Sequence, residues 1–168
     1  SYGLAYGLSA FGLSKQLGIS RGEAQGLMED YFERFGGVRD YLRDVVAEAR
    51  RSGFTETILG RRRHLPDLTS GNRQRREMAE RMALNAPIQG SAADLIKLAM
   101  LKVDEVLLRE FPRARMILQI HDELLFEGPA EEAGAVEELA RREMVGAFDL
   151  DPPLAVDIGV GADWLAAK

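Results

Sequence analysis

The chain has 168 residues, 46% of them hydrophobic, and a net charge of −5, which is typical of a globular domain with a real core. It contains no cysteine, which excludes disulfides and thiolate metal sites. No apolar stretch reaches the length of a membrane span, and the first residues lack a signal-peptide pattern.

The charge is unevenly distributed. Residues 50–81 hold nine arginines against four acids, so this segment carries +5 and the rest of the chain −10. The guanidinium group binds phosphate oxygens in pairs, and this segment therefore favours contact with nucleic acid. The alternative is a solvated helix face with local ion pairs, although Arg61, Arg62 and Arg63 have no acid near them in the sequence except Asp67.

The first part of the chain is predicted to be helical. Residues 1–18 suggest two short helical pieces. Ser20 and Glu23 form a capping box, which predicts a helix to about Phe35 that the following glycine pair ends. Apolar residues at helical spacing then predict a helix over 38–51.

Strands and longer helices follow. Residues 54–59 alternate and lead through a glycine into RRRHLP, which predicts a small hairpin that carries the arginines. A basic helix is predicted over 73–85, with a break at Pro87, and a long helix over 91–109. An acidic surface helix is expected over 131–147, and a final strand follows it over 154–160.

The most informative stretch is RMILQIHDELLFE, which covers residues 115–127. Two apolar runs flank His121, Asp122 and Glu123, and this pattern predicts two short strands joined by a tight turn. The turn would present these side chains on a rigid, buried support. Acids beside a core are costly unless they are paired or bind metal. The alternative is an ordinary polar hairpin tip.

Two other motifs are weaker on their own. Tyr2 and Tyr6 each precede a glycine, and they could simply be core aromatics. Arg81, Asn85 and Gln89 follow one another at steps of four, which would place them on one helical face, although a proline makes the last step irregular. Such donors could contact groove-edge acceptors and sugar oxygens of a duplex, or they could be a polar face with caps.

Together these segments resemble the carboxy-terminal part of family A DNA polymerases, the bacterial DNA polymerase I group, over essentially the whole chain. SYGLAYGLSAFGLS is similar to the end of the fingers helix that closes over the nucleotide. GRRRHLPDL, RMALNAPIQGSAADLIKLAM, LQIHDELLFE and VDIGVGADWLAAK are similar to later family segments in the same order. The resemblance implies an α+β fold, a partial palm with the small hairpin sheet, and helices of the fingers and palm. It implies the end of the fingers subdomain in 1–60 and of the palm in 61–168.

The resemblance also implies template-directed DNA synthesis in replication and repair, with primer-template DNA and dNTP as partners and two Mg²⁺ ions as cofactors. Asp122 is the expected metal ligand, with Glu123 peripheral to it and His121 at the primer-terminal phosphate. Tyr2 and Tyr6 would close on the nucleotide. The DNA-binding residues would be the backbone-holding arginines Arg61, Arg62 and Arg63, and the minor-groove readers Arg81, Asn85 and Gln89.

The sequence departs from the family in one respect. The family places a second catalytic aspartate on an earlier strand, and no substitute is found, because Asp94, Asp104 and Asp157 lie on predicted helices or a packed strand. The chain also starts without methionine. We therefore expect a fragment that holds one metal carboxylate, lacks the amino-terminal part of the same polymerase and is inactive alone. The intact enzyme would be cytoplasmic and nucleoid-associated, with no membrane partner.

Two alternatives stay open. The chain could be a non-catalytic duplex-DNA-binding module, which would tolerate the loss of Asp122 because a negative charge beside phosphate is unfavourable. It could also be related to single-subunit RNA polymerases, although Tyr2 and the HDE triplet favour the DNA enzyme.

Overall fold

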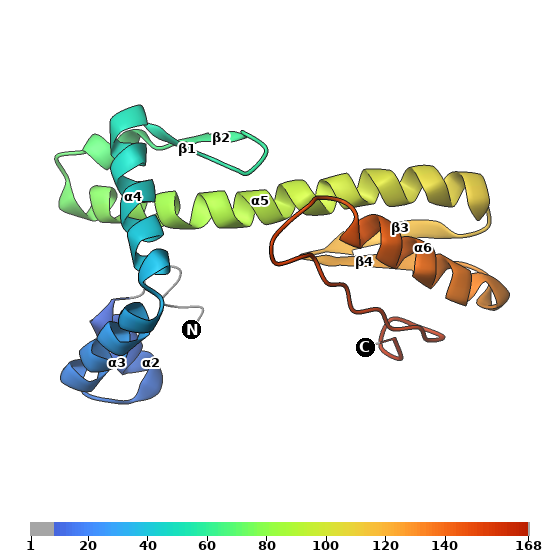
Figure 1. Cartoon of the computed structure of the whole chain (residues 1–168), viewed down its shortest axis with the longest axis horizontal. Coiled ribbons are helices and arrows are strands. Elements are labelled where there is room, and N and C mark those ends of the chain that lie inside the picture. The colour runs from blue at the N-terminus through green and yellow to red at the C-terminus, as the bar shows by residue number, and fades with distance from the viewer. Residues whose placement is uncertain (1–8, 168) are drawn as a thin grey trace. The chain divides into compact units, whose positions relative to one another are not determined.

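The structure is a computed structural model that describes residues 9–167 (Figure 1). The chain divides into two compact units, Ser1–Ser91 and Ala92–Lys168, and each is considered by itself. Within the described residues, α-helices are combined with two separate two-stranded antiparallel sheets, so the expected α+β class is confirmed. None of the helices in this part of the chain has the length and hydropathy of a membrane span.

The first unit begins with three helices. These are α2 (Ala10–Leu17), α3 (Arg21–Arg34) and α4 (Gly36–Ser52). The predicted capping box is confirmed, because the Glu23 N–H donates to Ser20 Oγ at 3.2 Å and Glu23 Oε2 accepts from the Ser20 N–H at 2.9 Å. The first of the two helical pieces predicted over 1–18 falls on residues outside the described part.

The sequence predicts that the glycine pair after Phe35 separates two helices, but both glycines belong to the second helix. One residue, Phe35 at φ −120° and ψ 54°, separates α3 from α4, which already begins at Gly36. Glycine costs stability mainly in the middle of a helix, so it is tolerated at the first positions of α4. The predicted end of α4 is confirmed, since Gly53 adopts the left-handed φ of 82° that glycine favours.

The predicted arginine hairpin follows, with shorter strands than expected. Strand β1 (Phe54–Glu56) pairs antiparallel with β2 (Arg62–His64), and Glu56 lies opposite Arg62. A 3₁₀ turn, η1 (Pro66–Thr69), leads into α5. The small core of this unit joins α4, η1 and α5 through five buried side chains: Ala49, Leu65, Leu68, Ala79 and Ala83.

Helix α5 (Arg73–Glu110) has 38 residues and continues through Pro87, so the break predicted over 85–90 is wrong. A proline inside a helix removes one N–H donor and costs about 3 kcal/mol. Packing outweighs that penalty, because α5 is buried on both sides of the proline, at Ala79 and Ala83 before it and at Ala99 and Val103 after it.

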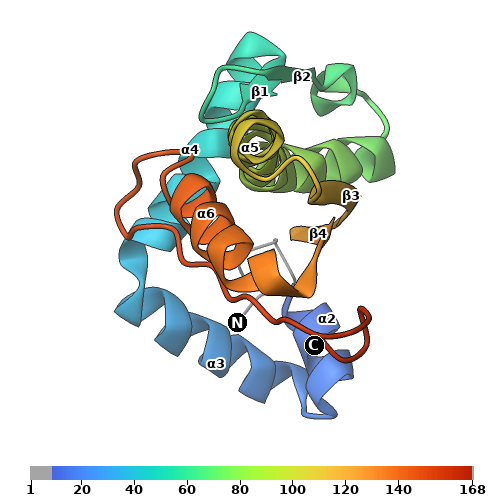
Figure 2. The ribbon, with the colours of Figure 1, turned by 90° about the vertical axis from the view of Figure 1, so that its right-hand side faces the viewer.

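The second unit gathers β3 (Arg115–Ile120), β4 (Glu123–Glu127) and α6 (Ala133–Val145) beside the second half of α5 (Figures 1 and 2). The predicted hairpin is confirmed, with Ile120 paired to Glu123. The acidic helix is also confirmed, preceded by the 3₁₀ turn η2 (Ala130–Glu132). The largest fully buried side chains of the chain's described part belong to this unit: Val103, Leu107 and Leu139.

The predicted strand over 154–160 is not formed, and residues 153–161 have no regular secondary structure. A strand needs a partner to pair its N–H and C=O groups. In the described residues, β3 and β4 pair only with each other, and residues 154–160 pair with neither open edge of this sheet.

Candidate functional site

The turn between β3 and β4 is tightly fixed. His121 and Asp122 connect the paired residues Ile120 and Glu123. His121 has a φ of 53°, in the left-handed region that few residues other than glycine adopt. The Gln119 side-chain amide donates a hydrogen bond to the His121 carbonyl oxygen. Two-residue hairpin turns require such a conformation, and the hydrogen bond from Gln119 helps to hold it.

The expected buried support of this turn is not found. His121, Asp122 and Glu123 are exposed, and Ile117 and Leu118 of β3 are 49% and 45% exposed. Both apolar runs beside the turn are predicted from the sequence to be core strands. A two-stranded sheet has too few neighbours to bury both of its faces.

The carboxylates of Asp122 and Glu123 have no ion-pair or hydrogen-bond partner among residues 9–167. Other acids of the same unit are paired, as when Arg113 binds Glu131 at 3.1 Å and also contacts Glu132. The turn therefore presents two adjacent negative charges that the described protein does not neutralise.

This donor set fits an incomplete Mg²⁺ site. No cluster of three or more possible metal ligands occurs within the described residues. Mg²⁺, however, is usually bound through one or two carboxylates, with waters and substrate phosphates as its other ligands. Asp122 and Glu123 supply that number of carboxylates.

The three consecutive arginines of the hairpin are used differently. Arg61 Nη2 donates to the Gly90 carbonyl oxygen at 2.9 Å. Arg62 Nε donates to Glu56 Oε1 at 2.6 Å, so Glu56 across the hairpin, and not Asp67, is the neighbouring acid. Arg63 is exposed and has no side-chain partner in the part of the chain that the structure describes.

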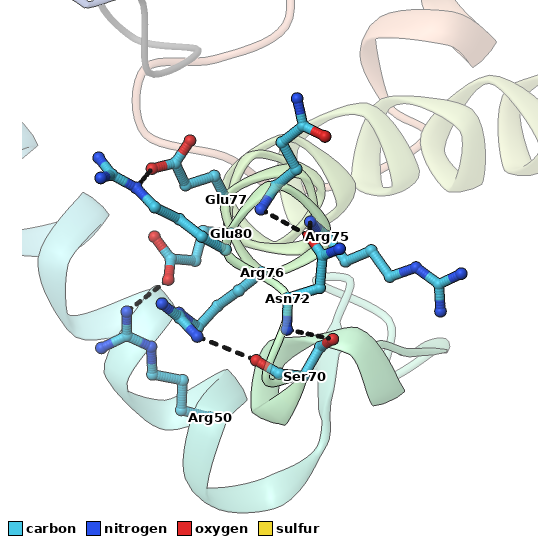
Figure 3. Close-up of polar contacts among 9 residues, drawn as sticks. Arg50, Ser70, Asn72, Arg75, Arg76, Glu77 and Glu80 are labelled. Atoms are coloured by element: carbon cyan, nitrogen blue, oxygen red, sulfur yellow. Dashed lines mark hydrogen bonds and ion pairs between the residues drawn. The ribbon is translucent and has the colours of Figure 1, made fainter.

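Other arginines of the 50–81 segment also bind within the protein. Figure 3 shows Arg50 paired with Glu80 at 2.5 Å, and Arg76 donating to the Ser70 carbonyl oxygen at 2.9 Å. The guanidinium group of Arg75 extends away from these contacts. The alternative of local ion pairs is therefore correct for part of this segment.

Arg73 and Glu77 form a further pair at 2.7 Å on the first turns of α5. The hydrogen bond from the Arg73 guanidinium, together with its positive charge, holds the pKa of Glu77 below its ordinary value. Arg81, which lies one helical turn further on, also lowers the pKa of Glu77 through its charge.

The polar row lies within one continuous helix, α5. Arg81, Asn85 and Gln89 follow one another at steps of four residues, with Pro87 between the last two. Arg81 and Gln89 are exposed. Asn85 is partly buried, and its Oδ1 atom is buried without a hydrogen-bond partner in the described residues.

Two site residues predicted from the sequence lie outside the described part of the chain, and some residues that make contacts in the structure were not predicted. Tyr2 and Tyr6 lie outside the described residues. Three further contact residues are not predicted from the sequence: Gly90 and Ser91, which contact the hairpin loop, and Gln119, which holds the turn. The glycine inside a helical pattern is the sequence feature that could have indicated the contact at Gly90.

The chain is similar to known proteins over nearly its whole length. The family model described as DNA polymerase family A matches residues 1–166. DNA polymerase I of Mycobacterium tuberculosis (strain ATCC 25618 / H37Rv) is 62% identical over 167 residues, which are 99% of this chain and 18% of that protein. The thermostable DNA polymerase I of Thermus aquaticus is 49% identical over 173 residues, which cover 100% of this chain and 20% of that protein.

A solved structure is also similar. It is the POL domain of Pol1 from M. smegmatis in complex with DNA primer-template and dNTP, with a TM-score of 0.96 and 61% identity. The match covers 99% of this chain and 29% of that one. The chain thus spans about a fifth of the length of the curated relatives named above, whose matched shares are 18% and 20%.

Proposed function

Because the chain belongs to DNA polymerase family A, we propose that it forms the carboxy-terminal part of a polymerase that adds deoxynucleotides to a primer 3′-hydroxyl. The observation that carries this proposal is the turn with two adjacent carboxylates, unpaired in the described residues, on a fixed hairpin. The primer-template and dNTP in the similar M. smegmatis structure support the substrate class. The intact enzyme would act in replication and repair, in the cytoplasm at the nucleoid.

The turn would supply part of the catalytic site. Asp122 would hold Mg²⁺, and Glu123, with its longer side chain, would take a peripheral position. Two bound Mg²⁺ ions in such a polymerase supply charge stabilisation to the attacking and leaving oxygens. The left-handed backbone of His121 and the brace from Gln119 keep Asp122 in one direction. The His121 side chain would contact the primer-terminal phosphate.

The first unit would bind the duplex. Arg63 and its neighbours Arg61 and Arg62 would hold the primer-template backbone, where contacts position the DNA without reading its sequence. The row of Arg81, Asn85 and Gln89 would contact minor-groove acceptors, which all base pairs present in similar places. This row would check the shape of each base pair independently of sequence.

The remaining assignments rest on the family. Residues 1–60 would be the end of the fingers subdomain and 61–168 the end of the palm. Tyr2 and Tyr6 would close on the incoming nucleotide, and the second catalytic carboxylate would come from the amino-terminal part of the same polymerase.

The test is primer extension by an intact polymerase that carries this segment. Each dNTP is supplied singly on a defined primer-template, with Mg²⁺ or with a chelator. We expect addition of the templated nucleotide alone, and only with Mg²⁺. A DNA-binding module would retain the duplex without extending it, and an RNA polymerase would use ribonucleotides without a primer. Either outcome would contradict the proposal.

A further inference from the structure

The loop of the arginine hairpin is fastened to the middle of α5. The Ile58 N–H donates to Ser91 Oγ at 2.9 Å, and the same hydroxyl donates to the Pro87 carbonyl oxygen at 2.5 Å. Arg61 Nη2 donates to the Gly90 carbonyl oxygen at 2.9 Å. Two hydrogen bonds therefore join the loop to consecutive residues of the helix, next to Gln89.

The loop, residues 57–61, is itself closed by hydrogen bonds. The Thr57 N–H donates to the Arg61 carbonyl oxygen at 3.0 Å, and the Arg61 N–H donates to Thr57 Oγ1 at 3.1 Å. The Gly60 N–H donates to the Thr57 carbonyl oxygen at 2.9 Å, with Gly60 in the left-handed conformation at φ 79°. A loop held in this way can fix the position of the helix residues that it contacts.

The contact needs a glycine on the helix. A Cβ atom on Gly90 would lie 2.6 Å from Thr57 Cγ2 and 3.5 Å from Arg61 Nη2. The Thr57 methyl cannot swing away easily, because its Oγ1 is held by the loop and a β-branched side chain has few rotamers. Glycine is a poor residue for a helix interior, so its presence here reflects the close approach of the loop.

The loop touches the helix shortly after a proline. Pro87 has no N–H, and one turn of α5 therefore lacks its usual hydrogen bond just before Gln89. Without a second support, this turn would bend more freely. The bonds to Gly90 and Ser91 supply that support from outside the helix.

We propose that loop 57–61 is a brace that sets the position of Gln89 on the DNA-facing row of α5. Thr57 and Ser91 are its positioning residues, and Gly90 provides the space for the contact. The inference rests on the proposed function, in which Gln89 reads the minor groove. The accuracy of this reading would then depend on the position of the hairpin that also carries Arg62 and Arg63, the proposed contacts to the DNA backbone.

The test measures discrimination in an intact polymerase that carries this segment. The readout is the ratio of kcat/KM for extending a matched primer terminus to that for a mismatched one. Gly90→Ala, which forces the loop from the helix, should lower this ratio at least about threefold. Thr57→Ser removes the clashing methyl but keeps the hydroxyl. The double variant Gly90→Ala/Thr57→Ser should therefore recover most of the ratio.

The Gln89→Ala variant separates the two proposals. If it leaves the ratio unchanged, the proposed role of Gln89 fails. If it lowers the ratio while Gly90→Ala does not, the brace fails and the role of Gln89 stands. With both correct, adding Gly90→Ala to Gln89→Ala should lower the ratio no further. Equal losses on matched and mismatched primers, with a lower Tm, would show a merely structural contact and overturn the brace.

A second variant covers the case in which Gly90→Ala does not fold. Ser91→Ala removes only the hydroxyl that accepts the Ile58 N–H and should also lower the ratio. Ser91→Thr keeps that hydroxyl and should preserve the ratio. If both Ser91 variants gave the parent ratio, the brace would be contradicted.

Discussion

The two units of the chain carry opposite net charges. Residues 1–91 hold fourteen Lys and Arg against eleven acids, a net charge of +3, whereas residues 92–168 hold eight against sixteen, a net charge of −8. In the first unit, many cations bind the protein itself, as Arg50, Arg62 and Arg73 do. In the second, the carboxylates of Asp122 and Glu123 have no partner in the described residues.

Charge count alone does not tell which side chains are available to a ligand, because several of them are paired within the protein. Nine arginines suggested a broad phosphate-binding surface over 50–81. The ion pairs leave fewer of them available, among which Arg63, Arg75 and Arg81 are exposed. The second unit is acidic and would repel DNA by its net charge, yet a cation could bridge a phosphate and the turn's carboxylates, which are unpaired in the described residues.

The largest expected effect tests whether the second unit's turn is sufficient for chemistry. The 168-residue chain purified alone should extend no primer, because its described residues offer two adjacent carboxylates and no larger ligand cluster. The measurement is Mg²⁺-dependent extension at high protein concentration, with the intact polymerase as control. Extension by the contaminant-free segment would contradict this expectation.

The next largest effect concerns DNA binding by the arginines of the first unit. In the intact polymerase, Arg63→Ala should weaken DNA binding on all sequences and flatten the slope of log affinity against log salt by about 0.9, as for one phosphate contact. Arg62→Ala is the matched control and should change the slope less, because Arg62 is paired with Glu56. Replacing Arg61, Arg62 and Arg63 together should flatten the slope by less than three full contacts.

An unchanged slope for Arg63→Ala would contradict the proposed phosphate contact, because the hairpin would then be a solvated face. A full effect from Arg62→Ala would show that the Glu56 pair opens on DNA.

A smaller effect asks whether the first unit also contacts the nucleotide. By family resemblance, Tyr2 lines the sugar pocket, and its phenolic oxygen would lie near the position of the 3′-hydroxyl. Tyr2→Phe should lower dideoxynucleotide use selectively, by one hydrogen bond of about 0.5–1.5 kcal/mol. The measurement is the ratio of kcat/KM for dideoxynucleotide and deoxynucleotide. A ratio that does not move would favour a core tyrosine.

The smallest effect concerns the support of the first unit. Ser20→Ala removes the cap of α3 and should lower stability by about 1 kcal/mol, seen as a lower Tm. Hydrogen bonds from the Ser20 side chain and backbone hold the pKa of Glu23 below its ordinary value. Their stabilisation is therefore present at neutral pH and is lost as the pH falls through that lowered pKa. The Tm difference between parent and variant should shrink in acid.

Local patterns predicted much of the fold. The Ser20–Glu23 box, the end of α4 at Gly53 and the hairpin around His121 each depend on a few neighbouring residues, and each is confirmed. The break at Pro87 was wrong because the local penalty is outweighed by packing on both sides of a long helix.

Features that depend on distant residues could not be predicted. The different uses of Arg61 and Arg62 follow from Gly90 and Glu56, which no spacing rule connects to them. The expected strand over 154–160 had the right pattern, but this segment pairs with no strand of the described residues. The same holds for the buried support of the turn, which a two-stranded sheet cannot provide.

The most direct test of the central claim is the Asp122→Asn variant of the intact polymerase. This change keeps the shape of the side chain and removes the charge that would hold Mg²⁺. Asp104→Asn is the matched control, since Asp104 is also an exposed carboxylate of the second unit. We predict a single-turnover extension rate for Asp122→Asn that is lower by about a thousandfold, with DNA affinity nearly unchanged and Asp104→Asn like the parent. A rate within about tenfold of the parent, a barrier change of about 1.4 kcal/mol or less, would show that Asp122 does not hold the metal.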